Sequence, residues 1–209
     1  MDLDLHINKV ELIGTYGGDE LHALSAWTST ARALTDDRRG RISKMLADLT
    51  SNGHHTPFEK SMLHFIVTCD TATHIHILKH RIGVSVNAES ARYKELKDDK
   101  SYLPVDWPVE EQMFLLDWLE RGQSNYHAAV GRLTPILGRK RAKESARFYL
   151  PYANQLTLDV SFNFRSLMHF MQLRNSEHAQ LEVREVAKQM LELVHGTGQF
   201  TESLRAFGY

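Results

Sequence analysis

Cysteine is nearly absent from this chain of 209 residues, in which Cys69 is the single one. No disulfide can therefore form within the chain, which favours a reducing compartment. The first residues, MDLDLHINKVELIG, carry early acidic residues and no long apolar run, unlike a secretory signal. No stretch approaches the roughly 18 apolar residues that a membrane span requires. We therefore predict a cytoplasmic protein without a membrane partner.

An excess of charge of one sign is also lacking. The 25 Lys and Arg residues nearly balance the 26 Asp and Glu residues, and the formal net charge is -1. Bulk electrostatics thus indicate no nucleic-acid partner, and any anion site must be built locally. Low-complexity linkers and internal repeats are missing too. The length and the hydrophobic content of 42% predict one domain, residues 1–209, with a real core.

Motifs for several kinds of catalysis are missing as well. The twelve histidines invite a metal hypothesis, but none is arranged as HExxH or as a cysteine–histidine zinc site. The chain has no GxSxG nucleophile elbow and no glycine-rich phosphate loop. Cys69 falls on the apolar face of an expected strand, where a thiol behaves as a small hydrophobe. We predict no metal site and no cysteine nucleophile.

Hydrophobic patterning predicts strands among runs of helices. Strands are expected at residues 6–13, 61–69 and 155–164, the last being the clearest because its apolar and polar residues alternate. Helices are expected at residues 20–34, 38–50, 73–81, 108–137 with a break at Gly122, 140–150, 165–174 and 178–194. Residues 82–92 are expected to form a loop or a broken helix, and residues 97–100 an exposed turn. Without regular βαβ alternation, the order predicts an α+β fold with an antiparallel or mixed sheet flanked by helices.

Basic residues flank a stretch of small hydrogen-bonding residues between positions 79 and 92. The basic residues are Lys79, His80, Arg81 and Arg92, and the small ones are Ser85, Asn87 and Ser90. Guanidinium groups and hydroxyls suit phosphate oxygens, so the pattern is typical of a phosphate site. A solvated charged turn is the alternative interpretation.

The segment NFRSLMHFMQLR, residues 163–174, carries arginines on an otherwise apolar helix. Arg165 and His169 are four residues apart and share a helix face, whereas Arg174 points elsewhere. Arginines on both sides of such a helix indicate anionic or carbonyl partners. Ordinary salt bridges are the alternative.

Three blocks of the chain resemble the flavin-dependent thymidylate synthase family. KHRIGVSVNAESARY, residues 79–93, is similar to the family signature of Arg-His-Arg followed by Ser-x-Asn-Glu-x-Ser-x-Arg-Tyr. GHHTPFEK, residues 53–60, resembles its Gly-His-x-Thr-Pro-Phe-Glu-His block. ARFYLP and NFRSLMHFMQLRNSEHAQLEVR resemble its carboxyl-terminal blocks. The blocks occur in the family order and span nearly two-thirds of the chain.

The resemblance implies an enzyme that reductively methylates dUMP at uracil C5 to give dTMP. Methylenetetrahydrofolate would supply the carbon, and NADPH would reduce the FAD cofactor. The family forms homotetramers in which several subunits contribute to each FAD and dUMP site. No enzymic cysteine attacks the pyrimidine in this family, in agreement with the independent interpretation of Cys69.

The resemblance also implies roles for individual residues. The FAD site would comprise Ser29, His54, Thr56, Glu59, Lys79, His80, Arg81, Asn163, Arg165 and His169. The nucleotide site would comprise His76, Lys79, Ala88, Glu89, Ser90, Ala91, Arg92, Arg147 and Arg174, with Ser90, Arg92 and Arg147 on the phosphate. Arg174 would be catalytic, because a fixed cation against the uracil stabilises negative charge at N3 and the carbonyl groups.

This chain departs from the family pattern around the nucleotide and the flavin. Lys79 replaces the first arginine, which keeps the charge but loses the bidentate fork. The spacer between Arg81 and Ser85 has three residues rather than two. In Ala88-Glu89 the carboxylate stands one position later than in the family pattern. His169 stands where the family has asparagine, and His76 where it has glutamine. The altered loop motivates one alternative, a sibling flavin enzyme that acts on UMP or installs another one-carbon group. A non-catalytic nucleotide- or RNA-binding module is another.

Overall fold

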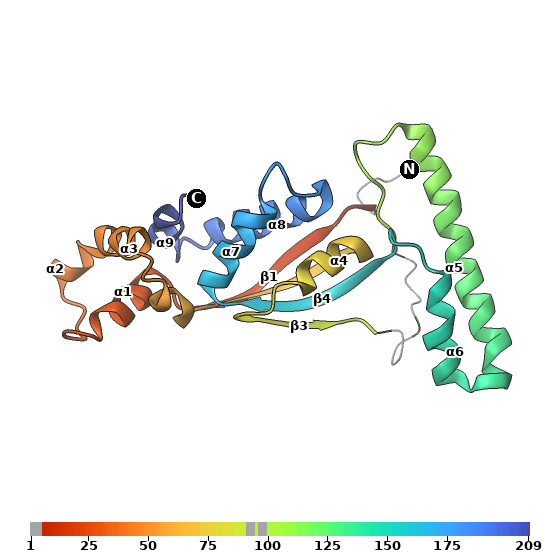
Figure 1. Ribbon diagram of the computed structural model, residues 1–209, viewed down its shortest axis with the longest axis horizontal. Helices are drawn as coiled ribbons and strands as arrows, with labels where there is room; N and C mark the ends of the chain where they lie inside the picture. Colours follow the sequence, from red (N-terminus) through yellow and green to blue (C-terminus); the bar gives the residue numbers. More distant parts are fainter. Residues whose placement is uncertain (1–5, 91–94, 96–99) are drawn as a thin grey trace. The chain divides into compact units, whose positions relative to one another are not determined.

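The computed structural model describes residues 6–90, residue 95 and residues 100–209. Its centre is a four-stranded antiparallel sheet in the order β1-β2-β4-β3 (Figure 1). The strands are β1 (Lys9–Tyr16), β2 (Met62–Asp70), β3 (Val84–Ala88) and β4 (Gln155–Phe162). The α-helices are α1 (Asp19–Trp27), α2 (Asp36–Arg39), α3 (Ile42–Ser51), α4 (Thr71–Leu78), α5 (Val109–Leu137), α6 (Arg139–Ala146), α7 (Phe164–Arg174), α8 (Leu181–Gly196) and α9 (Thr201–Ala206). The predicted α+β class is confirmed.

Strand β3 lies where we predicted a loop or a broken helix, so that prediction was wrong. Its pairing with β4 is antiparallel: the Asn163 N–H donates to Gly83 O at 2.9 Å, and the Glu89 N–H donates to Thr157 O at 3.0 Å. The Glu89 carboxylate also accepts from the Thr157 N–H at 2.9 Å. β3 has only five residues, and such a short segment becomes a strand through its neighbour rather than through its own propensity.

The alternation in the other strands was predicted well. In β2, Leu63, Phe65, Val67 and Cys69 are fully buried. Leu158, Val160 and Phe162 are buried in β4, whereas Asp159 between them is exposed. The first strand begins at Lys9 rather than at residue 6.

Helix α5 runs without interruption from Val109 to Leu137, so the predicted break at Gly122 was wrong. Gly122 is buried, and a Cβ there would meet Tyr149 O and Pro151 Cδ at 3.0 Å. This glycine thus allows a close approach between segments instead of ending a helix.

Helix ends differ from expectation for local reasons. The helix predicted over residues 20–34 ends at Trp27, because the hydroxyls of Thr28, Ser29 and Thr30 donate back to preceding carbonyls. The helix predicted over residues 38–50 is two helices, α2 and α3, and Thr35 caps the first of them. α9 was not predicted.

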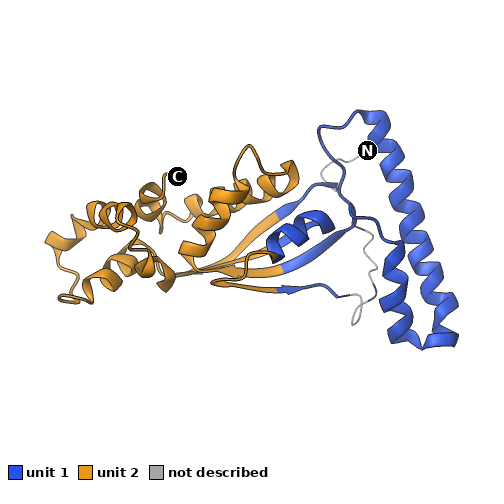
Figure 2. Ribbon diagram, in the orientation of Figure 1, with its two compact units in different colours: residues 1–9, 67–78, 87–158 blue, residues 10–66, 79–86, 159–209 orange. Residues whose placement is uncertain are grey.

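The chain divides into two compact units (Figure 2). Unit 1 comprises residues 1–9, 67–78 and 87–158, and unit 2 comprises residues 10–66, 79–86 and 159–209. In unit 1, α5 packs on α6 around Tyr126, Ala129, Val130 and Ala146. Unit 1 also buries a polar pair, in which Asn8 Nδ2 donates to Asp70 Oδ2 at 2.8 Å.

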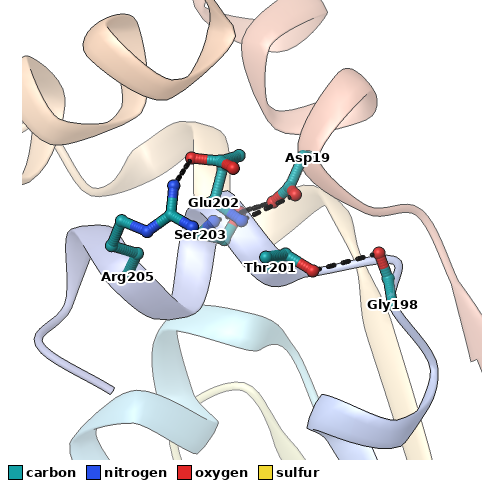
Figure 3. A network of polar contacts seen from close by, with 6 residues as sticks. All are labelled: Asp19, Gly198, Thr201, Glu202, Ser203 and Arg205. Atoms are coloured by element: carbon teal, nitrogen blue, oxygen red, sulfur yellow. Dashed lines mark hydrogen bonds and ion pairs between the residues drawn. The ribbon is translucent and has the colours of Figure 1, made fainter.

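The core of unit 2 is rich in phenylalanine. The fully buried rings are Phe58, Phe65, Phe162, Phe164, Phe170 and Phe200. The Asp19 carboxylate points at the first turn of α9 and accepts from the Glu202 and Ser203 N–H groups at 2.8 Å each (Figure 3). Asp19 therefore satisfies N–H groups at a helix start that has no cap of its own.

None of the described helices is both long enough and apolar enough to cross a membrane.

Candidate active site

A cavity of about 920 Å³ lies in unit 2. Seven residues that the sequence assigns to the site line it, namely Glu59, Lys79, His80, Arg81, Arg165, His169 and Arg174. They come from η2 (Thr56–Lys60), the segment between α4 and β3, and α7. Segments separated by more than a hundred residues thus meet around one hollow.

The lining combines positive charge with apolar surface. Its permanent cations are Lys79, Arg81, Arg165 and Arg174, and its only carboxylate side chain among the described lining residues is Glu59. Apolar side chains complete the wall, namely Ile82, Val84, Met168, Leu173 and Phe207. Such a lining suits an anionic ligand that also carries a flat apolar ring system.

The turn between α4 and β3 is fixed by a glycine. Gly83 has φ 65°, and a Cβ there would clash with the side chains of Asn163 and Ser166. Asn163 is the N-cap of α7, because its Oδ1 accepts from the Ser166 N–H at 2.8 Å. The turn that carries Lys79 to Arg81 therefore sits directly on the start of α7.

Helix α7 presents Arg165, His169 and Arg174 to the cavity. Arg165 forms an ion pair with Glu59, which offsets part of its charge. Arg174 ends the helix, where the dipole favours a cation. The side chains of Phe170 and Met171 on the same helix are fully buried and anchor it in the core.

Arg174 is coupled to His80. The Arg174 Nε–H donates to His80 Nε2 at 3.2 Å. The His80 ring packs edge-on against Phe170 with centroids 4.9 Å apart, and its centroid lies 6.1 Å from that of His169. The imidazole, which projects from the turn, is thereby held against α7.

Other residues assigned to the flavin belong to unit 2 but do not line the cavity. His54 and Thr56 lie at the start of η2, Asn163 is the cap of α7, and Ser29 follows α1 with its hydroxyl on Ala26 O at 3.0 Å. Of these, the Asn163 side chain contacts the turn that bears Lys79 to Arg81, so its effect on the lining is indirect.

The remaining residues assigned to the nucleotide belong to unit 1. His76 lies on α4, Ala88 ends β3 and is followed by Glu89 and Ser90, and Arg147 is exposed in η3 (Arg147–Tyr149). His76 Nδ1 is buried without a hydrogen-bond partner in the described part of the chain. Ala91 and Arg92 lie outside the described residues. Among the described residues that line the cavity of unit 2, His76, Ala88, Glu89, Ser90 and Arg147 do not occur.

Sequence reasoning missed part of the lining. His55, Ser166, Gln172, Phe207 and Tyr209 also face the cavity. The His55 and Phe207 rings lie with centroids 5.3 Å apart. The apolar spacing of Leu204 and Phe207 was the available signal for a carboxyl-terminal helix at this wall.

The described residues offer neither a metal-binding cluster nor a reactive thiol. Within the described ranges, no three His, Cys, Asp or Glu side chains are grouped so that they could hold a metal ion. Cys69 is fully buried in β2, and burial together with the Asp70 charge raises the pKa of its thiol. The thiol therefore stays protonated, as the sequence predicted.

Comparisons with known proteins match this chain to one family. The family model described as thymidylate synthase complementing protein matches residues 11–197. The flavin-dependent thymidylate synthase of Pseudothermotoga lettingae is 31% identical over 182 residues, which cover 85% of this chain and 80% of that protein. The corresponding enzyme of Kosmotoga olearia is 27% identical over 199 residues, which cover 85% of this chain and 81% of that protein.

Two solved structures are similar over almost the whole chain. They are those of the UMP/dUMP methylase PolB from Streptomyces cacaoi, one bound with 5-Br dUMP and the other with 5-Br UMP. Both are 26% identical to this chain and cover 97% of it, with TM-scores of 0.78 and 0.77. The matches cover 95% and 94% of the PolB chains.

Proposed function

Because the chain belongs to the family of flavin-dependent thymidylate synthases, we propose that it methylates dUMP at uracil C5 to give dTMP. The carbon would come from methylenetetrahydrofolate, which leaves as tetrahydrofolate. NADPH would be the reductant. The observation that carries this proposal is the cationic, partly apolar cavity in which Arg81, Arg165 and Arg174 meet.

The chemistry of the cavity fits FAD. A dinucleotide brings a pyrophosphate that needs cations and a flat ring that needs apolar contact, and both kinds of side chain line the cavity. The residues that would hold it are Ser29, His54, Thr56, Glu59, Lys79, His80, Arg81, Asn163, Arg165 and His169. When bound, the flavin supplies the reducing equivalents for the methylation.

The residues that the family resemblance assigns to the nucleotide would hold it. Ser90, Arg92 and Arg147 would bind the phosphate through hydroxyl and guanidinium donors. His76, Lys79 and the segment from Ala88 to Ala91 would complete the site.

Arg174 would lie against the uracil and stabilise negative charge on the ring. As the ring is activated, negative charge develops at N3 and at the carbonyl oxygens, and a fixed guanidinium stabilises it. The helix end and His80 hold this guanidinium in advance, so little reorganisation is needed during the reaction.

We also propose that the active enzyme is a homotetramer with sites shared between subunits. Large apolar side chains are exposed on this chain, among them Phe114 at 70%, Trp118 at 63% and Phe148 at 84%. Clusters of exposed apolar side chains are typical of protein interfaces. A partner subunit would cover such surfaces and supply the phosphate-binding residues.

A second candidate is methylation of UMP. The similar PolB structures hold 5-Br dUMP and 5-Br UMP, and this chain has an altered signature loop with Lys79 and one extra residue. Its own substrate would then be a ribonucleotide or both nucleotides.

One purification tests these proposals. The protein should be yellow or take up FAD, and it should convert dUMP to a product heavier by one methylene group when methylenetetrahydrofolate and NADPH are present. A parallel assay with UMP decides between the candidates by product mass and turnover. A folded protein that takes up no flavin and only binds nucleotide would contradict both and favour a binding module.

The role of Arg174 has its own test. Arg174→Ala should lower turnover by about 100-fold to 1,000-fold, because it removes a charge needed in the transition state. Flavin absorbance of the purified variant should persist. Arg132→Ala, at an exposed position of α5, is the matched control and should behave like the wild type.

A further inference from the structure

His80 meets Arg174 through a defined pair of atoms. The Arg174 Nε–H donates to His80 Nε2 at 3.2 Å. A guanidinium has only donors, so the histidine nitrogen must be the acceptor. A histidine accepts through Nε2 only when it is neutral and carries its proton on Nδ1. The hydrogen bond therefore fixes both the charge state and the tautomer of His80.

Neighbouring side chains hold His80 and Arg174 in the positions that their hydrogen bond requires. The His80 ring is braced edge-on by Phe170, whose side chain is fully buried on α7. Arg174 leaves the same helix one turn further on, at its last residue. An arginine has many rotamers, and one hydrogen bond to a braced ring removes much of that freedom.

We infer that neutral His80 is the positioning residue for Arg174, holding its guanidinium in the orientation that the reaction requires. This role rests on the proposed function, since it concerns the catalytic cation. It is separate from any contact of His80 with the flavin, because it acts through Arg174.

The charge around His80 gives the role a pH dependence. Among the described residues that line this cavity, the titratable and charged side chains are Arg174, His169 and Arg165 from α7, Lys79 and Arg81 beside His80, and Glu59, His55 and Tyr209. Protonation of His80 would remove the acceptor and set a second cation against Arg174. Turnover should therefore fall as the pH is lowered and His80 takes up a proton.

Two variants separate the hydrogen bond from packing. His80→Leu removes the acceptor, and His80→Gln keeps an acceptor oxygen that does not titrate in this pH range. We expect His80→Leu to lower kcat by about 10-fold to 100-fold with a smaller change in KM for dUMP, because positioning acts mainly in the transition state. His80→Gln should restore much of kcat and lose the acidic limb of the pH profile. His195→Gln, at an exposed position of α8, is the control.

A double-mutant cycle tests whether His80 acts through Arg174. In an Arg174→Lys background, the guanidinium Nε–H is gone, so His80→Leu should cost little more. If the two losses multiply, His80 acts independently and the inference is overturned. The inference also fails if His80→Gln behaves like His80→Leu.

A measurement without flavin or substrate completes the test. ¹⁵N nuclear magnetic resonance of labelled histidine, assigned with the His80→Gln variant, should show His80 neutral with its proton on Nδ1. Its Nε2 signal should shift in Arg174→Lys. A proton on Nε2 would overturn the inference. Absence of flavin uptake and turnover in the wild type would instead overturn the proposed function and, with it, this catalytic role.

Discussion

At the scale of single residues, His22 is the clearest case of a group whose charge state the fold decides. Its ring is fully buried between Phe58, Phe164 and Phe200. Nδ1 is 2.8 Å from Ser203 Oγ and Nε2 is 2.8 Å from Ser61 Oγ. Both nitrogens therefore have partners that suit a neutral imidazole. Burial lowers the pKa of His22 from 6.5 to about 4.

The low pKa of His22 predicts that the fold loses stability in mild acid. Below pH 6.5 the unfolded chain takes up a proton on this histidine, whereas the folded chain does so only near pH 4. The contribution of neutral His22 to the free energy of unfolding is therefore complete above pH 6.5, and it is lost as the pH falls from 6.5 to about 4. Its size is about 3 kcal/mol. Urea unfolding of the wild type at several pH values within this window measures it.

Two variants check that His22 is the cause. His22→Gln keeps an amide for the two serines but does not titrate, so its unfolding free energy should depend less on pH between 6.5 and 4. His195→Gln removes an exposed histidine and should keep the wild-type slope. An unchanged slope in His22→Gln would contradict the assignment.

Cys69 gives a second prediction at this scale. Its thiol is buried and its pKa is raised, so it cannot supply a thiolate to the pyrimidine. Cys69→Ala should keep kcat within about twofold and lower the free energy of unfolding by about 1 kcal/mol, because it leaves a small cavity. Cys69→Ser buries a hydroxyl instead and should destabilise more, with similar turnover. A Cys69 variant that folds but has no activity would refute the proposal that the reaction needs no cysteine nucleophile.

Residue-level prediction from sequence succeeded where a motif lay in a contiguous block. Lys79, His80 and Arg81 were found together and line the cavity together. The hydrogen bond from Arg174 to His80 joins residues 94 positions apart, and no spacing rule reports such a contact. His55 and Phe207 were missed for the same reason, since only packing brings them to one wall.

At the scale of elements, Gly83 joins two of them. Its φ of 65° suits glycine, and an added Cβ would clash with the cap of α7. Gly83→Ala should therefore lower the free energy of unfolding by about 2 kcal/mol, half from backbone strain and half from the disturbed cap. It should also weaken FAD uptake, because Arg165 is in the first turn of α7. Denaturant unfolding and flavin titration measure the two effects.

The chain offers a matched control for this substitution. Gly198 has nearly the same φ, 66°, but no atom lies within 4 Å of the position that its Cβ would take. Gly198→Ala should therefore show the backbone cost alone and normal FAD uptake. Equal losses in the two variants would show that contact with the cap contributes nothing.

The structure of the turn between α4 and β3 also accounts for the extra residue in the signature loop. Ile82, Gly83 and Val84 separate Arg81 from Ser85, and the glycine turns the chain onto β3. From the sequence this stretch looked like a loop, because five small and β-branched residues carry little signal. Strands β2 and β4 were predictable because each alternates over eight or more residues. The end of α1 and the unbroken course of α5 depended on side-chain hydrogen bonds and close packing, which hydrophobic patterning does not report.

At the scale of the whole molecule, the α+β class followed from the order of elements, but the division into two units did not. The boundary between units falls inside all four strands, so no linker or change of composition marks it. The expectation of one domain stays a prediction. The residues assigned to the flavin belong to unit 2, whereas most of those assigned to the nucleotide belong to unit 1.

The proposed sharing of sites between subunits predicts that two inactive variants can restore each other. Arg147→Ala lacks a phosphate ligand and Arg174→Ala lacks the catalytic cation, so each homotetramer should be inactive. If Arg147 and Arg174 of one site come from different subunits, co-expression of the two variants creates some intact sites. With random assembly of a symmetric tetramer, about a quarter of the sites should be intact. The measurement is turnover per bound flavin, after purification through two different affinity tags.

The mass of the co-expressed variants in solution is needed to interpret their activity. The mixed sample should sediment at about four times the chain mass of 24.0 kDa, as the wild type should. A mixed tetramer without activity would mean that each site takes Arg147 and Arg174 from one subunit. A monomer with full activity would exclude shared sites altogether. Recovery near one quarter requires that a phosphate ligand and a catalytic cation on different copies of the chain meet at one nucleotide.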